Sequence, residues 1–141
     1  MAVRVVVHST RAVRDGKSLN HWTIFLLLAE DQSIRINMRD KTPEEWKYGL
    51  PDDADYGEPG CMELIRHLYQ TSTSAIRYWD FPCLAGHRVD EFVNTLIRNG
   101  RGYYTMAVGG SGCRYWVYTA VSDFVVAELI QEDAAQTLLR H

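Results

Sequence analysis

The sequence contains little cysteine and no long apolar run. Its 141 residues include three cysteines, Cys61, Cys83 and Cys113, which lie far apart along the chain. An odd and sparse set of cysteines argues against a disulfide framework and fits a reducing compartment, so we expect a cytoplasmic protein. No segment approaches the roughly 20 apolar residues of a membrane-spanning helix. The N-terminus also lacks the apolar region of a signal peptide. We therefore expect no membrane span.

A strong positive charge and the common metal-binding motifs are also absent. The formal net charge is −3, whereas nucleic acids and anionic membranes require a basic surface. The five histidines are widely spaced, and no CxxC, HxH or HExxH pattern occurs. These patterns are the usual signs of a metal site. We therefore expect no nucleic-acid partner, no metal ion and no cofactor.

The composition is that of a globular protein. Hydrophobic residues make up 46% of the chain and charged residues 23%, which is typical of a folded protein. A chain of 141 residues suffices for one domain with a hydrophobic core. No internal repeat or low-complexity linker divides it, so we expect a single domain over residues 1–141.

Strand patterns are clearest near the N-terminus. Residues 3–8 are rich in β-branched valine, as strands are. Residues 22–28 form an apolar run that is too short for a typical helix and indicates a buried strand. Residues 33–39 alternate between apolar and polar side chains, and we expect them to form a hairpin with the buried strand.

The middle of the chain gives weaker signals. Residues 62–69 and 74–81 indicate two further strands, although the first of these also fits a helix. Residues 41–60 are rich in proline, glycine and acidic side chains. They predict a long loop with one short helical turn near residues 44–46. In a small domain such a loop is often a lid or a binding loop.

Helical patterns follow in the second half. A helical stripe ends at Asn99-Gly100, a typical helix end; its members are Val89, Phe92, Val93, Leu96 and Ile97. A second helix is predicted to begin at Cys113 and a last one to cover residues 133–139, with a short extended piece at 103–108. Four apolar residues share a helical face with Cys113, namely Val117, Ala120, Val121 and Phe124. The predicted fold class is α+β, with an antiparallel β-sheet packed against two or three helices.

Cys113 is the first candidate for a catalytic side chain. It follows the loop Gly109-Gly110-Ser111-Gly112 and begins a predicted helix. A helix start favours negative charge, which stabilises a thiolate. A buried cysteine is more often a small apolar side chain, however. The glycine-rich loop also fits a phosphate site, but no Lys-Ser/Thr pair follows it.

His21 is the candidate base, because it stands at the head of the apolar strand. Thiol catalysis requires an imidazole beside the thiolate and a polar group that orients the ring. A histidine at a strand start often only satisfies a backbone carbonyl. Asn37 or Arg35 could orient His21, depending on the hairpin register. A two-residue turn at Asp31-Gln32 puts Asn37 on the opposite sheet face, whereas a three-residue turn puts it on the same face.

Aromatic residues surround Cys113 in the sequence. Such residues most often pack in the core, but they also line apolar substrate pockets. The substrate-binding candidates are Trp22, Arg35, Tyr104, Tyr115 and Trp116. Backbone groups at Ser111, Gly112 and Cys113 are candidates for holding an oxyanion.

The order of these motifs resembles that of circularly permuted papain-like proteins, such as the lecithin retinol acyltransferase-like and PPPDE-like groups. The matching pieces are His21-Trp22, then Tyr104, then Cys113 at the head of a helix, and residues 89–116 match best. The resemblance implies a permuted papain-like fold with Cys113 as nucleophile and His21 as base. Gly112 stands where those groups usually have asparagine. The whole chain also resembles an uncharacterised family of small fungal proteins with His-Trp and Gly-Cys-Arg-aromatic-Trp signatures.

Three functions follow from these candidates. The first is a thiol-dependent hydrolase or acyltransferase acting on an amide, ester or thioester of a small or lipid-like substrate, in which Cys113 attacks the carbonyl and His21 shuttles the proton. The second is a cyclase or isomerase of fungal natural-product biosynthesis, with His21, Arg35 or Tyr104 in acid/base roles. The third is a non-catalytic module whose aromatic pocket holds a small molecule or a second copy of the chain, as in a homodimer.

Overall fold

The structure of the protein is a computed structural model. It describes the backbone of residues 1–14, 17–40, 58–69, 75–106 and 113–140. Within these ranges it describes all side chains except those of residues 9–14, 17–20, 40, 58–59, 104–106 and 113. The loop predicted over residues 41–60 therefore lies largely outside the described part, as does its helical turn.

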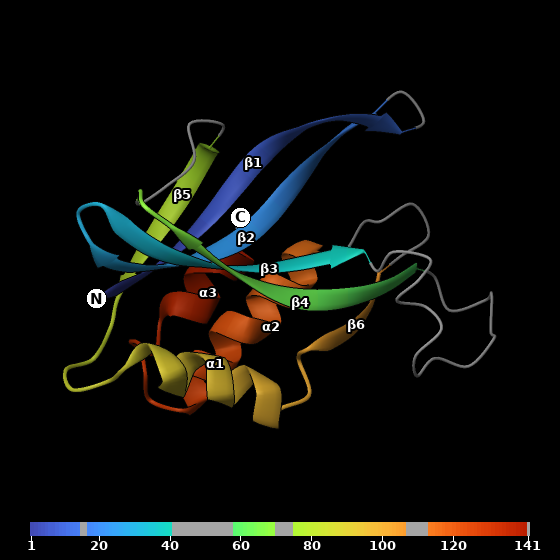
Figure 1. The fold of residues 1–141 in the computed structure, drawn as a ribbon. Coiled ribbons are helices and arrows are strands. Elements are labelled where there is room, and N and C mark those ends of the chain that lie inside the picture. Colours follow the sequence, from blue (N-terminus) through green and yellow to red (C-terminus); the bar gives the residue numbers. More distant parts are fainter. Residues whose placement is uncertain (15–16, 41–57, 70–74, 107–112, 141) are drawn as a thin grey trace.

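The described residues form one six-stranded sheet, with the strand order β5-β1-β2-β3-β4-β6 and every neighbouring pair antiparallel. The strands are β1 (Ala2–Arg14), β2 (Lys17–Ala29), β3 (Gln32–Asp40), β4 (Glu58–His67), β5 (Ala75–Pro82) and β6 (Tyr103–Met106). The helices are α1 (Val89–Arg98), α2 (Cys113–Val126) and α3 (Ala134–Leu139). Figure 1 shows that these helices lie together on one side of the sheet. The predicted α+β class, with a sheet packed against helices, is confirmed.

Two sequence predictions fall short in the strands. β1 and β2 are 13 residues each, because their pairing continues through the polar residues beyond His8, as far as Arg14 opposite Lys17. Residues 62–67 belong to a strand, β4, so the helical alternative for this segment is wrong. In both places backbone hydrogen bonds between strands hold the ladder, whatever the side chains are.

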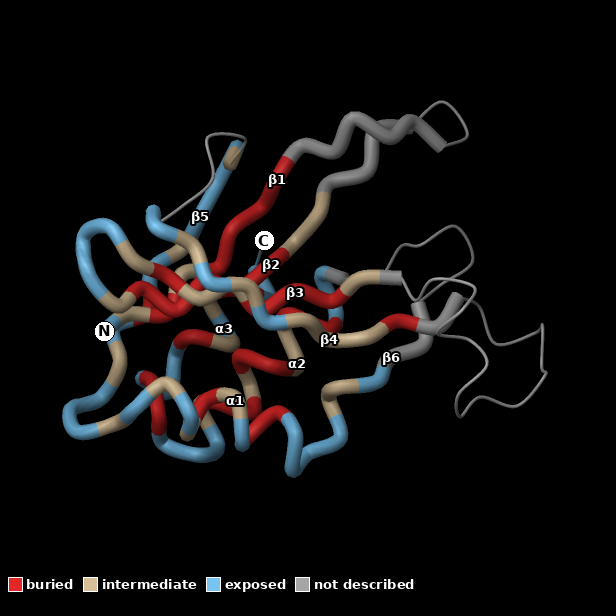
Figure 2. The backbone as a smooth tube through the Cα atoms, in the orientation of Figure 1, coloured by how far each residue is buried: buried red, intermediate tan, exposed pale blue. Residues whose placement is uncertain are grey.

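The hydrophobic core lies between the sheet and the helices. Val5, Ile24, Leu26 and Ile36 are completely buried and belong to one cluster with side chains from all three helices. Figure 2 shows the buried residues gathered where the central strands meet the helices. We call this side of the sheet the helix face. The opposite side, which no described helix covers, is called the open face.

Helix α2 supplies the centre of this core. Val117, Ala120, Val121 and Phe124 are 0% exposed, so the helical stripe predicted for them is confirmed. The ring of Phe124 meets Phe92 of α1 edge to face, with 5.1 Å between ring centroids. Such aromatic pairs add to the free energy of area burial.

A bulge sets the register of the β2–β3 hairpin. Ala29 pairs with Gln32 across a two-residue turn, and the register then shifts between Leu27 and Ala29. Because one extra residue on a strand moves all following side chains to the other face, Ile24 comes to pair with Ile36. His21 and Asn37 consequently lie on the same face, the arrangement that the sequence predicted only for a three-residue turn.

The two faces of α1 give a stability prediction. We expect Leu96→Ala to lower the free energy of unfolding by about 2–5 kcal/mol, because it leaves a cavity in the core; Leu96 is 0% exposed. Ile97 is the next residue and is 57% exposed. We expect Ile97→Ala to change the free energy of unfolding by about 0.5 kcal/mol or less. Urea denaturation measures both, and equal losses would contradict the buried face assigned to α1.

Candidate functional site

The orientation of His21 follows from that of its neighbour. Trp22 points to the helix face, where its ring stacks on Trp79 with 5.1 Å between centroids and 15° between planes. Successive side chains of a strand point to opposite faces. His21 therefore points to the open face, where its Nε2 atom lies 2.5 Å from the amide oxygen of Asn37.

Glu63 determines which way the amide of Asn37 is turned. Asn37 pairs with Glu63 across β3 and β4, and its Nδ2 atom donates a hydrogen bond of 2.8 Å to Oε1 of Glu63. A carboxylate only accepts hydrogen bonds, so the amide oxygen of Asn37 must face His21. His21 then donates from Nε2, and the neutral ring has its lone pair on Nδ1. The other oxygen of Glu63 accepts a hydrogen bond of 2.9 Å from Nε of Arg39.

Arg35 brings a positive charge to the same face. Its Nε atom donates to the hydroxyl of Thr23 at 3.1 Å, and that hydroxyl donates to the carbonyl of Ile36 at 3.0 Å. Burial lowers the pKa of Arg35, against the opposing influence of Glu63. No carboxylate of the described residues forms an ion pair with Arg35. The guanidinium is therefore a half-buried charge whose partner is a neutral hydroxyl.

Two further histidines lie close to Arg35. His8 pairs with His21 across β1 and β2 and is 6% exposed. Burial, with smaller contributions from Arg35 and His21, lowers the pKa of His8 to about 4. Burial and Arg35 also lower the pKa of His67 on β4. His8 is therefore uncharged at neutral pH, and the pKa of His67 is shifted in the same direction.

These groups surround one buried ring. The centroid of Phe25 lies 6.3 Å from that of His8 and 5.9 Å from that of His67, and Cζ of Arg35 is 5.9 Å from it. We define the polar cluster by six residues of the open face: His8, His21, Arg35, Asn37, Glu63 and His67. An oriented imidazole and a half-buried cation on the same face of a sheet are groups that can move protons and stabilise negative charge.

His21 points to the sheet face opposite helix α2, and its expected pairing with Cys113 stays a prediction. Helix α2 begins at Cys113, as predicted, and β2 does pack against α2. It does so through Trp22, which has Cζ of Arg114 at 5.1 Å from its ring centroid, whereas His21 points the other way. The side chain of Cys113 lies outside the described part, so its role stays a prediction.

The predicted substrate-binding residues divide between the two faces. Trp22 and Tyr115 line a pocket on the helix face, and Arg35 lies on the open face. Trp116 is 1% exposed, and its indole nitrogen donates to the carbonyl of Arg101 at 2.9 Å. Its helical position points it into the core. The role of Trp116 in binding a substrate stays a prediction. Ser111, Gly112 and the side chain of Tyr104 lie outside the described residues.

His8, Glu63 and His67 were missed by the sequence analysis. His8 is the last residue of the strand predicted over residues 3–8. Alternation put its side chain on the face opposite that of Val7, but the sequence did not show which strand would lie beside it. Glu63 and His67 belong to residues 62–69, for which the sequence fitted both a strand and a helix. Only the pairing of β4 with β3 brings them to the polar cluster.

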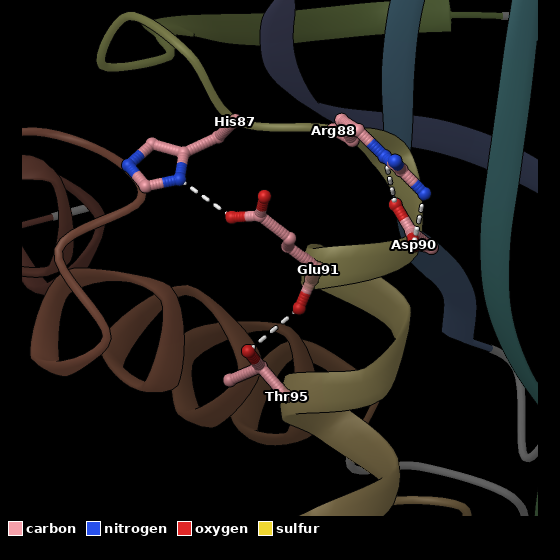
Figure 3. Close-up of polar contacts among 5 residues, drawn as sticks. All are labelled: His87, Arg88, Asp90, Glu91 and Thr95. Carbon is pink, nitrogen blue, oxygen red and sulfur yellow. Dashed lines mark hydrogen bonds and ion pairs between the residues drawn. The ribbon is translucent and has the colours of Figure 1, made fainter.

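A second group of polar side chains lies at the start of α1 (Figure 3). Nδ1 of His87 contacts the carboxylate of Glu91 at 2.6 Å, Arg88 forms an ion pair with Asp90 at 2.8 Å, and the hydroxyl of Thr95 donates to the carbonyl of Glu91 at 2.7 Å. Acidic side chains in the first turn of a helix stabilise it. These contacts are satisfied within the group, so we assign it a structural role.

Comparison with known proteins gives a family. Residues 3–141 match the family described as "Domain of unknown function (DUF7770)". The chain belongs to this family. No curated protein and no solved structure matches this DUF7770 chain. None of its described helices is long and apolar enough to cross a membrane, and among the described residues no group of three His, Cys, Asp or Glu side chains is placed to hold a metal ion.

The polar cluster gives a titration prediction. We expect Arg35→Gln to raise the pKa of His8 above its value of about 4, because a neighbouring cation disfavours the imidazolium. The pKa should stay below the ordinary value of 6.5, since burial, the larger cause, is unchanged. NMR titration of the imidazole signals measures this shift. Arg66→Gln, which removes an exposed arginine beside Val89, is the control. An unchanged pKa of His8 in Arg35→Gln would contradict the assigned coupling.

Proposed function

We propose that the polar cluster is the active site of an enzyme that moves protons on a small molecule, of the cyclase or isomerase class. The observation that carries this proposal is the hydrogen-bonded chain from His21 through Asn37 to Glu63. An amide has no net charge, so Asn37 orients the imidazole without fixing its charge state. A ring held in this way can accept a proton and return it.

The reaction that fits these groups is a proton transfer beside a carbonyl. His21 removes a proton from the carbon next to the carbonyl, and that C–H bond breaks. The proton goes to Nδ1 of His21, and the electron pair goes to the carbonyl oxygen, which becomes an enolate stabilised by Arg35. When the substrate carries a β,γ double bond, the enolate is a dienolate, and return of the proton to its γ carbon completes an isomerisation. His21 and Arg35 are the catalytic residues, and Asn37 and Glu63 are positioning residues.

Arg35 suits this role because of its surroundings. It is half-buried, so its charge acts in a medium of lower dielectric constant than water. It also contributes to the lowered pKa values of His8 and His67, which disfavours a positive charge on these two imidazoles. Glu63 attracts the charge of Arg35 from a distance, but none of the described carboxylates forms an ion pair with Arg35. A developing oxyanion in direct contact with the guanidinium would therefore gain an interaction that no described ion pair already makes.

Hydrogen exchange tests this proposal. The protein is incubated in D2O with a panel of small ketones, 1,3-diketones and 2-oxo acids, and loss of the C–H signal beside the carbonyl is followed by NMR. We expect His21→Gln to slow the exchange by about 100-fold or more, the usual contribution of an acid/base group. Glu63→Gln should lower the rate less and shift its pH profile, since Glu63 acts through Asn37. His87→Gln, at the start of α1, is the matched control.

A measurement on the protein alone keeps the proposal testable without a substrate. The nitrogen chemical shifts of His21 report which ring nitrogen carries the hydrogen, and we expect it on Nε2. The opposite tautomer would contradict the proposed relay. Full exchange activity in a folded His21→Gln protein would equally exclude His21 as the base.

We propose thiol-dependent acyl transfer as a second candidate, favoured by the start of α2 at Cys113. We expect Cys113 to react with iodoacetamide well below the ordinary thiol pKa of about 8.5, because a helix start stabilises a thiolate. Cys83 is the internal control, since burial raises its pKa. Labelling of Cys113 that is no faster than that of Cys61 and Cys83, measured by mass spectrometry across pH, would exclude this candidate.

A further inference from the structure

A pocket on the helix face is separate from the polar cluster. It has a volume of about 230 Å³ and lies where β2, the first turns of α2 and the end of α3 meet. Trp22, Arg114, Tyr115, Tyr118, Leu138 and Leu139 are among the residues that line it. We call it the aromatic pocket. Sites for drug-sized molecules measure about 300–1,000 Å³, so this volume suits a smaller ligand of one or two fused rings.

Aromatic side chains form the walls of the aromatic pocket. The ring of Trp22 is packed against that of Trp79. The rings of Tyr115 and Tyr118 come from adjacent turns of α2, with 6.5 Å between their centroids. Leu138 is 3% exposed and Leu139 is 66% exposed, so the floor is closed and the rim is open. Aromatic walls of this kind favour a planar ring, which stacks against them or meets them edge to face.

Arg114 gives the aromatic pocket a positive charge. Its Cζ atom lies 5.1 Å from the ring centroid of Trp22, and the residue is exposed. No carboxylate in the described part of the chain forms an ion pair with it. Of the residues that line the pocket, Arg114 is the charged one. A guanidinium binds a carboxylate through two parallel hydrogen bonds, and this geometry suits a flat anion.

We propose that the aromatic pocket binds a small aromatic carboxylate, with its ring against the aromatic residues that line the pocket and its carboxylate on Arg114, which lies over the ring of Trp22. The aromatic walls select the ring, and Arg114 selects the charge. This site is independent of the proposed proton-transfer site, because the sheet separates it from His21. Its ligand therefore need not be a substrate of the polar cluster.

Two probes with the same ring separate the roles of shape and charge. Calorimetry compares 1-naphthoate with 1-naphthalenemethanol, which has no charge. We expect Arg114→Gln to lower the affinity for 1-naphthoate by about tenfold, because one charged hydrogen-bond pair is lost. The affinity for the alcohol should not change. Tyr115→Ala changes a side chain that is 64% exposed, so the fold should persist. This variant should bind both probes more weakly, because it loses one aromatic wall. Arg98→Gln, an exposed arginine on α1, is the matched control.

NMR shift mapping locates the bound probe. We expect 1-naphthoate to shift the signals of Trp22 and Tyr115 and to leave those of His21 and His67 unchanged. No binding at millimolar 1-naphthoate, or equal affinity in Arg114→Gln and the unaltered chain, would overturn the proposal. A pocket covered by a second copy of the chain would also overturn it, and Tyr115→Ala would then change the sedimentation velocity rather than ligand affinity.

Discussion

The packing of β2 against α2 is the interaction on which the rest of the structure depends. Ile24 and Leu26 of β2 are completely buried and share one core cluster with Val117 and Val121 of α2. Because side chains of a strand alternate between faces, this contact also determines where the intervening residues point. The same packing that forms the core therefore turns His21 to the open face. The position of the candidate base is a consequence of core packing.

The open face is unusual for a sheet surface that no described helix covers. Val6 and Phe25 are 0% exposed and His8 is 6% exposed. Burying a polar group destabilises a protein unless the group is hydrogen-bonded, and burying a charge costs more. Asn37 and Glu63 are joined by a hydrogen bond, and the lowered pKa of His8 avoids the larger cost of a buried charge. Arg35 is the exception, since it keeps a charge with a neutral partner, and such exceptions are common at functional sites.

The sheet divides the molecule into two chemical environments. On the open face, titratable groups surround Phe25. On the helix face, Trp22, Tyr115 and Arg114 form an aromatic wall with one charge. His21 and Trp22 are consecutive residues, yet they belong to different environments, because the strand that carries them is covered differently on its two sides. The His21-Trp22 motif of the sequence therefore contributes one side chain to each of two separate surfaces.

Much of this architecture could be predicted from local patterns. The hairpin of residues 22–28 with 33–39, the helix that ends near Asn99 and the helix that begins at Cys113 all follow from periodicity and from glycine positions. These signals are present in short windows of sequence, because a helix or a strand repeats its burial pattern every few residues. His21 and Asn37 could also be named as partners, but only under a condition on the turn.

Tertiary structure decided which residues meet. The bulge before Ala29 selected the register that joins His21 to Asn37, and the pairing of β4 with β3 added Glu63. The packing of α2 on one face of the sheet put Trp22 and Trp116 on that side and left His21 pointing to the other. These outcomes depend on contacts between residues far apart in the chain. A local pattern shows that a strand has two different faces, but only the packed molecule determines what each face meets.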